Sequence, residues 1–239
     1  MTGKPLSAFL LAVSLFGLAA VAVSTLYPAP ISEAFPTRKL LIGSAFVLLT
    51  VAGLTAVFSP DKCSRLVSLR RGRNSDTRNV VGSPRKGHTI RGHHPDCGNF
   101  SSHVIRVRSR TFCAGCAGLF IGGVISLLGA LAYFFGGLEL GNKDSLFVAI
   151  GSLSVGFGLI LPILKIQLNL VRLLANAALP FGSLLILIGA DSMSQSISLD
   201  AFLIVLIFFW LFTRISISQS GHRQVCQLCK DGSCELRGF

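Results

Sequence analysis

Six apolar stretches, each about 20 residues long, constrain this 239-residue chain more than any other feature. The hydrocarbon core of a bilayer is about 30 Å thick, and a helix of about 20 apolar residues crosses it. A soluble domain would need about a quarter of its residues charged, whereas only 13% are charged here. The sequence therefore predicts an all-α polytopic membrane protein with six transmembrane helices, at residues 6–27, 40–58, 117–135, 145–164, 173–190 and 199–217.

The first span also has features of a secretory signal peptide. Lys4 precedes its apolar run, and small residues stand at Ala20, Ala22 and Ser24. However, the apolar core is longer than about 15 residues, which favours an uncleaved anchor. Cleavage would leave five helices with the N-terminus outside, and the topology of the later helices would not change.

Lys and Arg are distributed unevenly among the segments between the spans. Basic residues are retained on the cytoplasmic side, and an N-terminus on that side leaves only Arg38, Lys39 and Lys143, of 22 Lys and Arg, in outer segments. We therefore expect a multi-pass protein of the cell membrane, N-in and C-in, with the long loop and the tail in the cytoplasm. The formal charge of +12 is then a topology signal and a contact with anionic lipid headgroups, and no nucleic acid partner is expected.

The spans divide the chain into four regions. We expect an N-terminal transmembrane hairpin at residues 1–58, a basic cytoplasmic loop at 59–116, a four-helix transmembrane bundle at 117–218, and a cytoplasmic Cys-rich tail at 219–239. Histidine and cysteine gather in the second half of the loop and in the tail, so these two regions hold the residues that could carry chemistry.

A pair of cysteines ends the loop. Cys113 and Cys116 are separated by the small residues Ala114 and Gly115. Two thiolates at this spacing can bind one metal ion, because the short turn between them brings both sulfurs to a tetrahedral centre. A single Cys-x-x-Cys pair is weak evidence by itself, and the additional histidines and cysteines nearby strengthen it.

The segment before this pair predicts how further ligands reach it. Apolar and basic residues alternate over 104–112, which is typical of a short strand or of a hairpin that turns near Arg108 and Ser109. Such a hairpin would return the preceding residues toward the cysteine pair. The preferred site is a small cytoplasmic Cys/His knuckle made of Cys97, His103, Cys113 and Cys116, with His93 or His94 as a substitute ligand.

The tail holds a second group of candidate ligands, expected on the same side of the membrane. Two arrangements are open. The tail can form a separate site of its own, or Cys113 and Cys116 can share a four-thiolate site with Cys226 and Cys229 across the bundle. The spacing does not decide between them. The tail ligands are His222, Cys226, Cys229 and Cys234.

Thiolate and imidazole ligands in a tetrahedral arrangement select zinc or an iron–sulfur cluster. Zinc is the expected metal, and an iron–sulfur cluster is the alternative. A third interpretation is a thiol redox pair, because Cys113 and Cys116 precede a helix whose N-terminal amides activate a thiol. Disulfides are disfavoured, since the expected topology places every cysteine on the reducing side.

Polar residues are scarce inside the expected spans. Asn169, Arg172 and Asn176 form one stripe, which we interpret as interfacial anchoring for the first two and an interhelical hydrogen bond for Asn176. Asp200 and Arg214 bracket the sixth span, so Arg214 is expected to snorkel. These residues build no proton relay or ion pathway, and the sequence has no acidic pair of the kind that an aspartyl protease needs. Close helix packing is predicted at Gly122, Gly123, Gly151, Gly156 and Gly158.

Residues 97–123 resemble a signature of small multi-pass membrane proteins from prokaryotes, some of them archaeal. In that family a Cys/His segment precedes a Cys-Ala-x-Cys-x-Gly turn that opens a transmembrane helix, as in Cys113 to Gly118 here. The bacterial members usually have Arg where this chain has Gly115. The resemblance covers about 25 residues. It implies a protein of the inner membrane and supplies no activity.

These patterns together predict an integral membrane protein with a structural zinc site on its cytoplasmic face. It would act as a scaffold, or as a subunit of a membrane complex, with a membrane or cytoplasmic protein partner. The alternative is a membrane oxidoreductase that uses an iron–sulfur cluster, a catalytic metal or the Cys-x-x-Cys thiol pair. The sequence does not decide whether the protein is an enzyme.

Overall fold

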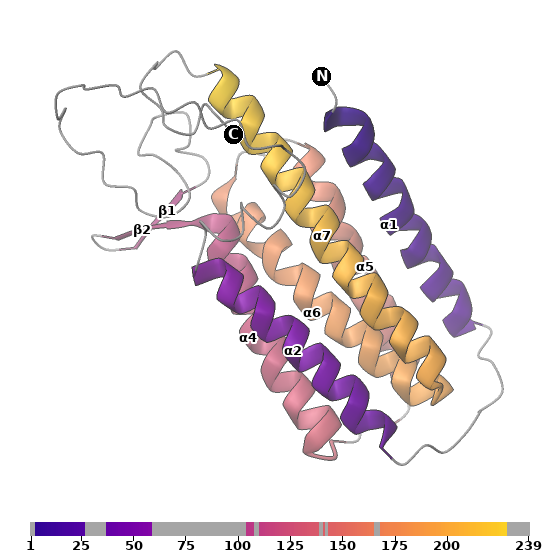
Figure 1. Cartoon of the computed structure of the whole chain (residues 1–239). Coiled ribbons are helices and arrows are strands. Elements are labelled where there is room, and N and C mark those ends of the chain that lie inside the picture. Colours follow the sequence, from indigo (N-terminus) through magenta and orange to yellow (C-terminus); the bar gives the residue numbers. More distant parts are fainter. Residues whose placement is uncertain are drawn as a thin grey trace, which may run out of the picture.

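The computed structural model describes residues 3–26, 37–58, 104–107, 110–138, 141, 143–164 and 168–228. Within them lie six helices that are long and apolar enough to cross a membrane, so all six predicted spans are confirmed as helices (Figure 1). Two short strands precede α4. The elements are α1 (Gly3–Leu26), α2 (Arg38–Phe58), β1 (Val104–Val107), β2 (Arg110–Cys113), α4 (Ala114–Ala130), α5 (Asp144–Ile160), α6 (Asn169–Ser194) and α7 (Ile197–Leu228).

Several helices end differently from the sequence prediction. A π-helical turn (Leu131–Phe135) extends α4, and a 3₁₀ turn (Leu161–Leu164) that contains Pro162 closes α5. Helix α7 shows the largest difference, because the predicted span ends at about 217 whereas the helix continues to Leu228. The first residues of the expected tail are therefore helical.

Helix α6 lies at the centre of the bundle, and α5 packs against it in the antiparallel direction (Figure 1). A Cβ atom at Gly151 would lie 2.7 Å from the carbonyl oxygen of Gly182, and one at Gly158 would lie 2.9 Å from that of Ala175. Side chains at these positions would separate the two backbones. The close packing predicted for Gly151 and Gly158 is thereby confirmed.

Helix α4 packs along another side of α6 and runs parallel to it. A Cβ atom at Gly118 would collide with the carbonyl oxygen of Leu173, and one at Gly122 would collide with that of Ala177. The two pairs advance by four residues on each helix, which fixes the parallel direction. Glycine-mediated contacts of this kind let helix backbones approach closely in a bilayer.

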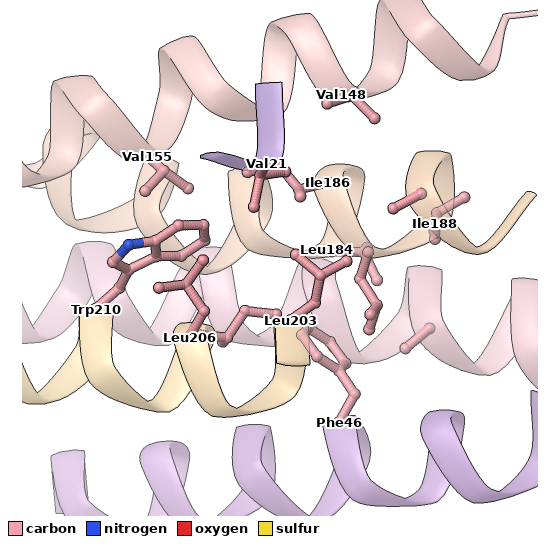
Figure 2. Close-up of a cluster of buried hydrophobic side chains, with 14 of the residues drawn as sticks. Val21, Phe46, Val148, Val155, Leu184, Ile186, Ile188, Leu203, Leu206 and Trp210 are labelled. Atoms are coloured by element: carbon pink, nitrogen blue, oxygen red, sulfur yellow. The ribbon is translucent and has the colours of Figure 1, made fainter. Parts of the chain in front are cut away.

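The remaining helices close the core through side chains (Figure 2). Trp210 of α7 is fully buried, and its indole Nε1 donates a hydrogen bond to the carbonyl oxygen of Ser14 in α1, at 3.1 Å. The Ser14 hydroxyl also bonds to the hydroxyl of Thr213, at 3.0 Å. Phe46 of α2 and Val155 of α5 are buried in the same cluster. The helices thus share one continuous apolar core.

The outer surface of the bundle is apolar as well. Phe16, Leu48 and Leu153 are each at least 70% exposed, and each of the six long helices has large apolar side chains exposed. Soluble monomers rarely expose apolar surface of this extent. Lipid acyl chains can cover such a surface without the free-energy cost of exposing apolar side chains to water. The structure is therefore consistent with a multi-pass membrane protein.

The bundle has two distinct ends (Figure 1). The strands β1 and β2 lie at the end where α4 and α6 begin, which we call the hairpin end. Helices α2 and α7 begin at the opposite end, which we call the Arg38 end after the first residue of α2.

The contact between α5 and α6 generates a first prediction. Gly151→Ala should lower the free energy of unfolding by about 1–3 kcal/mol, because the added methyl group meets the backbone of α6. Gly53→Ala in α2 is the matched control, since nothing lies within 4 Å of a Cβ atom at that position. Thermal unfolding of the detergent-purified protein measures the difference, and equal stability of the two variants would contradict the packing.

Candidate functional site

The cysteine pair stands where the hairpin meets helix α4. Cys113 is the last residue of β2, with an extended backbone (φ −69°, ψ 124°), and Ala114 starts the helix. Cys116 lies in the first helical turn. Residues three apart in a helical turn share a face. Both cysteines are partly buried reduced thiols.

The register of the hairpin confirms part of the sequence interpretation. Strand β1 pairs with β2 in the antiparallel direction, with Val107 opposite Arg110 and Val104 opposite Cys113. The hairpin predicted over 104–112 is thus present. The first residue of β1 therefore lies beside the first cysteine of the pair.

Most of the other predicted ligands fall outside the described residues. In the part of the chain that the structure describes, no three or more His, Cys, Asp or Glu side chains are grouped so that they could hold a metal ion. His222 and Cys226 belong to the C-terminal extension of α7, where they stand four positions apart. Outside the described residues lie Cys97, His103, His93, His94, Cys229 and Cys234.

Two guanidinium groups are within electrostatic range of Cys113. Arg172 of α6 and Arg214 of α7 both interact electrostatically with the sulfur of Cys113. The Nε atom of Arg214 is buried and donates to no acceptor among the described residues, while the residue as a whole is partly exposed. Positive charge beside a sulfur stabilises a thiolate.

Asn176 behaves differently from the expected interhelical contact. Its amide Nδ2 donates a hydrogen bond to the carbonyl oxygen of Arg172 in the same helix, at 2.6 Å. Polar side chains of this length can bond back to the preceding turn. Helix α4 passes close to this amide group. A Cβ atom at Gly115 would lie 3.5 Å from Asn176 Nδ2.

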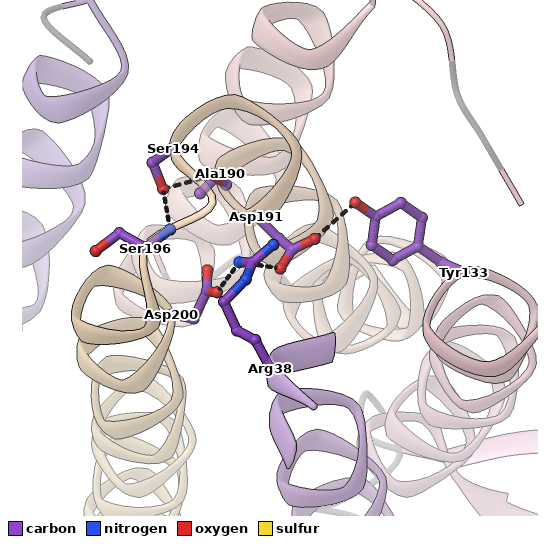
Figure 3. A network of polar contacts seen from close by, with 7 residues as sticks. All are labelled: Arg38, Tyr133, Ala190, Asp191, Ser194, Ser196 and Asp200. Carbon is purple, nitrogen blue, oxygen red and sulfur yellow. Dashed lines mark hydrogen bonds and ion pairs between the residues drawn. The ribbon is translucent and has the colours of Figure 1, made fainter. Parts of the chain in front are cut away.

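The Arg38 end contains a buried ionic network that the sequence analysis does not anticipate (Figure 3). We call Arg38, Tyr133, Asp191 and Asp200 the Arg38 network. Nη1 of Arg38 lies 2.5 Å from Asp191 Oδ1 and 2.5 Å from Asp200 Oδ2. The Tyr133 hydroxyl donates a hydrogen bond to Asp191 Oδ2, at 2.8 Å. Four helical segments therefore meet at one polar cluster.

The network is almost completely removed from solvent. Asp191 and Asp200 are 0% exposed, and Arg38 is 6% exposed. Lys39, the neighbour of Arg38, lies at the surface with its ammonium 4.8 Å from the centre of the Tyr133 ring. A buried charge needs a partner to be tolerated in an apolar interior, so Arg38 and the two carboxylates depend on each other.

A tight turn between α6 and α7 brings the two aspartates together. Gln195 adopts the left-handed conformation (φ 48°) and its N–H donates to the Asp191 carbonyl, at 3.2 Å. The Ser194 hydroxyl donates to the Ala190 carbonyl and accepts from the N–H of Ser196. Because the turn is so short, residues at the end of α6 and the start of α7 stay close.

The network changes one expectation from the sequence. The predicted second span starts at residue 40 and leaves Arg38 before it, whereas Arg38 begins α2 and is buried against Asp191 and Asp200. The sequence does contain a signal for this network, since Asp191 comes directly after the expected fifth span and Asp200 lies near the start of the sixth. Two acids on either side of a short connection, with an arginine at the start of another span, predict a contact.

Searches of protein-family models, of curated proteins and of solved structures find no match to this chain.

The Arg38 network generates a second prediction. Arg38→Met should destabilise the protein by about 3–5 kcal/mol, because it removes the only cation that contacts the two buried aspartates among the described residues. Lys39→Met is the matched control, and it should cost no more than about 1 kcal/mol, the worth of an exposed cation–π contact. Thermal unfolding measures both variants. Similar losses of stability in the two variants would show that the ion pairs of Arg38 do not stabilise the fold.

Proposed function

We propose that this chain is a multi-pass membrane protein in which a structural zinc ion fastens the long loop to the helical bundle at the hairpin end. The observation that carries the proposal is the hairpin register, with Val104 opposite Cys113. His103 precedes Val104 by one peptide bond, and consecutive Cα atoms are about 3.8 Å apart. This connectivity supports a site that joins His103 to the two thiols at the start of α4.

The proposed ligand set is the one expected from the sequence. Cys113 and Cys116 supply two thiolates from the first turn of α4, His103 supplies an imidazole, and Cys97 completes a tetrahedral site, with His93 or His94 as its substitute. Zinc suits these ligands, and a closed set of four is typical of structural zinc.

The tail offers the second arrangement. Helix α7 ends at the hairpin end, where its C-terminal turns carry His222 and Cys226. Cys226 and Cys229 could complete a four-thiolate site with the pair at α4, or they could join His222 and Cys234 in a site of their own. Both arrangements draw the tail to the hairpin end.

The role we propose for the zinc is structural. A structural metal adds its binding free energy to folding, so it would hold the loop 59–116 as an ordered docking surface. The bundle would then act as a scaffold, or as a subunit of a membrane complex, that presents this surface to a membrane or cytoplasmic protein. The basic composition of the loop favours a cytoplasmic position for the hairpin end.

A second candidate function is a membrane oxidoreductase. It is favoured by one observation, namely that two reduced thiols open a helix and that the first of them, Cys113, is within electrostatic range of Arg172 and Arg214. Such surroundings are typical of reactive cysteines. An iron–sulfur cluster or a catalytic metal on the same ligands belongs to this candidate as well.

Metal analysis tests the zinc proposal. Protein purified in detergent without oxygen should contain one zinc per chain and no visible colour, whereas two zinc ions per chain would indicate separate loop and tail sites. Cys113→Ser and Cys116→Ser should each lose the loop zinc and unfold at lower temperature, because a structural metal is part of the folding free energy. Elemental analysis and thermal unfolding measure these effects.

Cys63→Ser is the matched control, since Cys63 is outside the proposed ligand set and should be replaceable without loss of metal. Full metal content and full stability in both Cys113→Ser and Cys116→Ser would refute the zinc site. Iron with visible absorbance would favour the oxidoreductase, and a metal-free protein with reversible oxidation of the pair would favour a thiol redox function.

Thiol labelling tests the proposed orientation. All seven cysteines lie in segments assigned to the cytoplasm or next to them. A membrane-impermeant maleimide should therefore leave the protein unlabelled in intact cells and label it after permeabilisation. Lys143→Cys is the control, because it introduces a thiol in an outer segment that should react in intact cells. Labelling of the unmodified protein in intact cells would reverse the assignment.

A further inference from the structure

The Arg38 network has an imbalance of charge that its surroundings do not correct. Two carboxylates, Asp191 and Asp200, face a single guanidinium, and each is completely buried. In the part of the chain that the structure describes, Arg38 is the only cation that contacts either of them. Lys39 is exposed to solvent and lies on the ring of Tyr133. With both aspartates ionised, the buried cluster would carry one uncompensated negative charge.

The geometry makes this charge costly. Asp191 Oδ1 and Asp200 Oδ2 lie 2.5 Å from the same nitrogen atom, so the two oxygens are at most 5.0 Å apart. Two like charges at this separation repel strongly where water is excluded. Two carboxylates that share one site cannot both ionise readily.

The hydrogen bonds of the two aspartates are incomplete as well. Asp200 Oδ1 is buried and has no hydrogen-bond donor among the described residues. Asp191 Oδ1 is buried too, and it contacts Arg38 as an ion pair without the geometry of a hydrogen bond. A buried polar atom without a hydrogen bond is rare and requires an explanation. A proton on either carboxyl group adds a donor to the cluster and removes the excess charge in the same step.

We infer that the Arg38 network is a proton-binding site, in which Asp191 and Asp200 together hold one dissociable proton beside Arg38. The site is independent of the proposed zinc, since it lies at the opposite end of the bundle. Its proton exchanges with water at the Arg38 end, where α6 turns into α7. Intramembrane ionisable residues are rare and usually functional.

The other groups around the pair leave this assignment intact. From the π-helical turn, Tyr133 donates to Asp191 Oδ2. From the α6–α7 turn, Ser194 and Ser196 bond to each other and to the backbone. From α5, Asp144 approaches α6 through its backbone carbonyl, which would meet a Cβ atom at Gly189. Within the described residues, none of these groups brings a second buried positive charge.

Infrared spectroscopy of the full chain in lipid nanodiscs tests the inference, because a protonated carboxyl group absorbs at a different frequency from a carboxylate. At pH 7 the unmodified protein should show a band from a protonated, buried carboxyl. Asp191→Asn and Asp200→Asn should each abolish it, because the remaining aspartate is balanced by Arg38. Arg38→Gln should double it, because two carboxyls then need protons.

Asp144→Asn is the control, because Asp144 Oδ1 is also buried without a hydrogen-bond donor among the described residues. The band should survive this substitution, and its loss would place the proton outside the network. The inference is overturned if the unmodified protein lacks the band, or if the band survives in both Asn variants. It is also overturned if sodium, compared with choline at equal ionic strength and pH, raises the unfolding temperature of the unmodified protein but not of Asp200→Asn. That result would identify a monovalent cation as the ligand.

Discussion

The direct packing of α4 and α5 against the backbone of α6 is the constraint on which the rest of the structure depends. In a bilayer the helices gain nothing from hiding apolar side chains from lipid, so packing must come from close backbone approach. Glycines supply it here, at Gly118 and Gly122 of α4 and at Gly151 and Gly158 of α5. Each glycine lies against a specific residue of α6, and the helices cannot slide without collision.

This packing fixes the position of both candidate sites. Helix α4 starts at the cysteine pair and its π-helical extension contains Tyr133, while α6 contributes Arg172 at one end and Asp191 at the other. At about 1.5 Å per residue, Arg172 and Asp191 are about 28 Å apart. The parallel α4–α6 pair is therefore one packed unit, with two thiols and a guanidinium group at one end and a hydroxyl and a carboxylate at the other.

Local patterns in the sequence predict the six spans, the hairpin over 104–112 and the close contacts of Gly151 and Gly158, because each depends on residues a few positions apart. They do not separate these glycines from Gly156, where a Cβ atom would make only an ordinary contact with Leu18, at 3.6 Å. Pairs of distant residues are not predictable in this way. The Arg38 network joins Arg38 to Asp200 across 162 positions, and a hydropathy pattern contains no information on such a pair. A charge at the end of an apolar run is interpreted as a loop residue, which is why the sequence prediction leaves Arg38 and Asp191 outside the helices.

The same reasoning explains the smaller differences. Helix α7 extends beyond 217 because the end of an apolar run marks where a lipid-facing surface stops, while the helix itself continues through polar residues. The prediction gives Asn176 a partner on another helix, but the turn before it offers a carbonyl at no cost in geometry. For the metal ligands, the sequence supplies spacing and the structure adds the register of one hairpin. Most of the loop and tail ligands lie outside the described residues.

Helix α7 packs in a different way from α4 and α5. It packs through side chains, such as Trp210 and Leu206, rather than through glycine contacts with α6, and side chains can repack where backbones cannot. Loss of a proton from the Arg38 network would set Asp191 of α6 against Asp200 of α7, and α6 is held in place by its two close neighbours. The repulsion would therefore act on the contact between α6 and the first turn of α7, which side chains hold together.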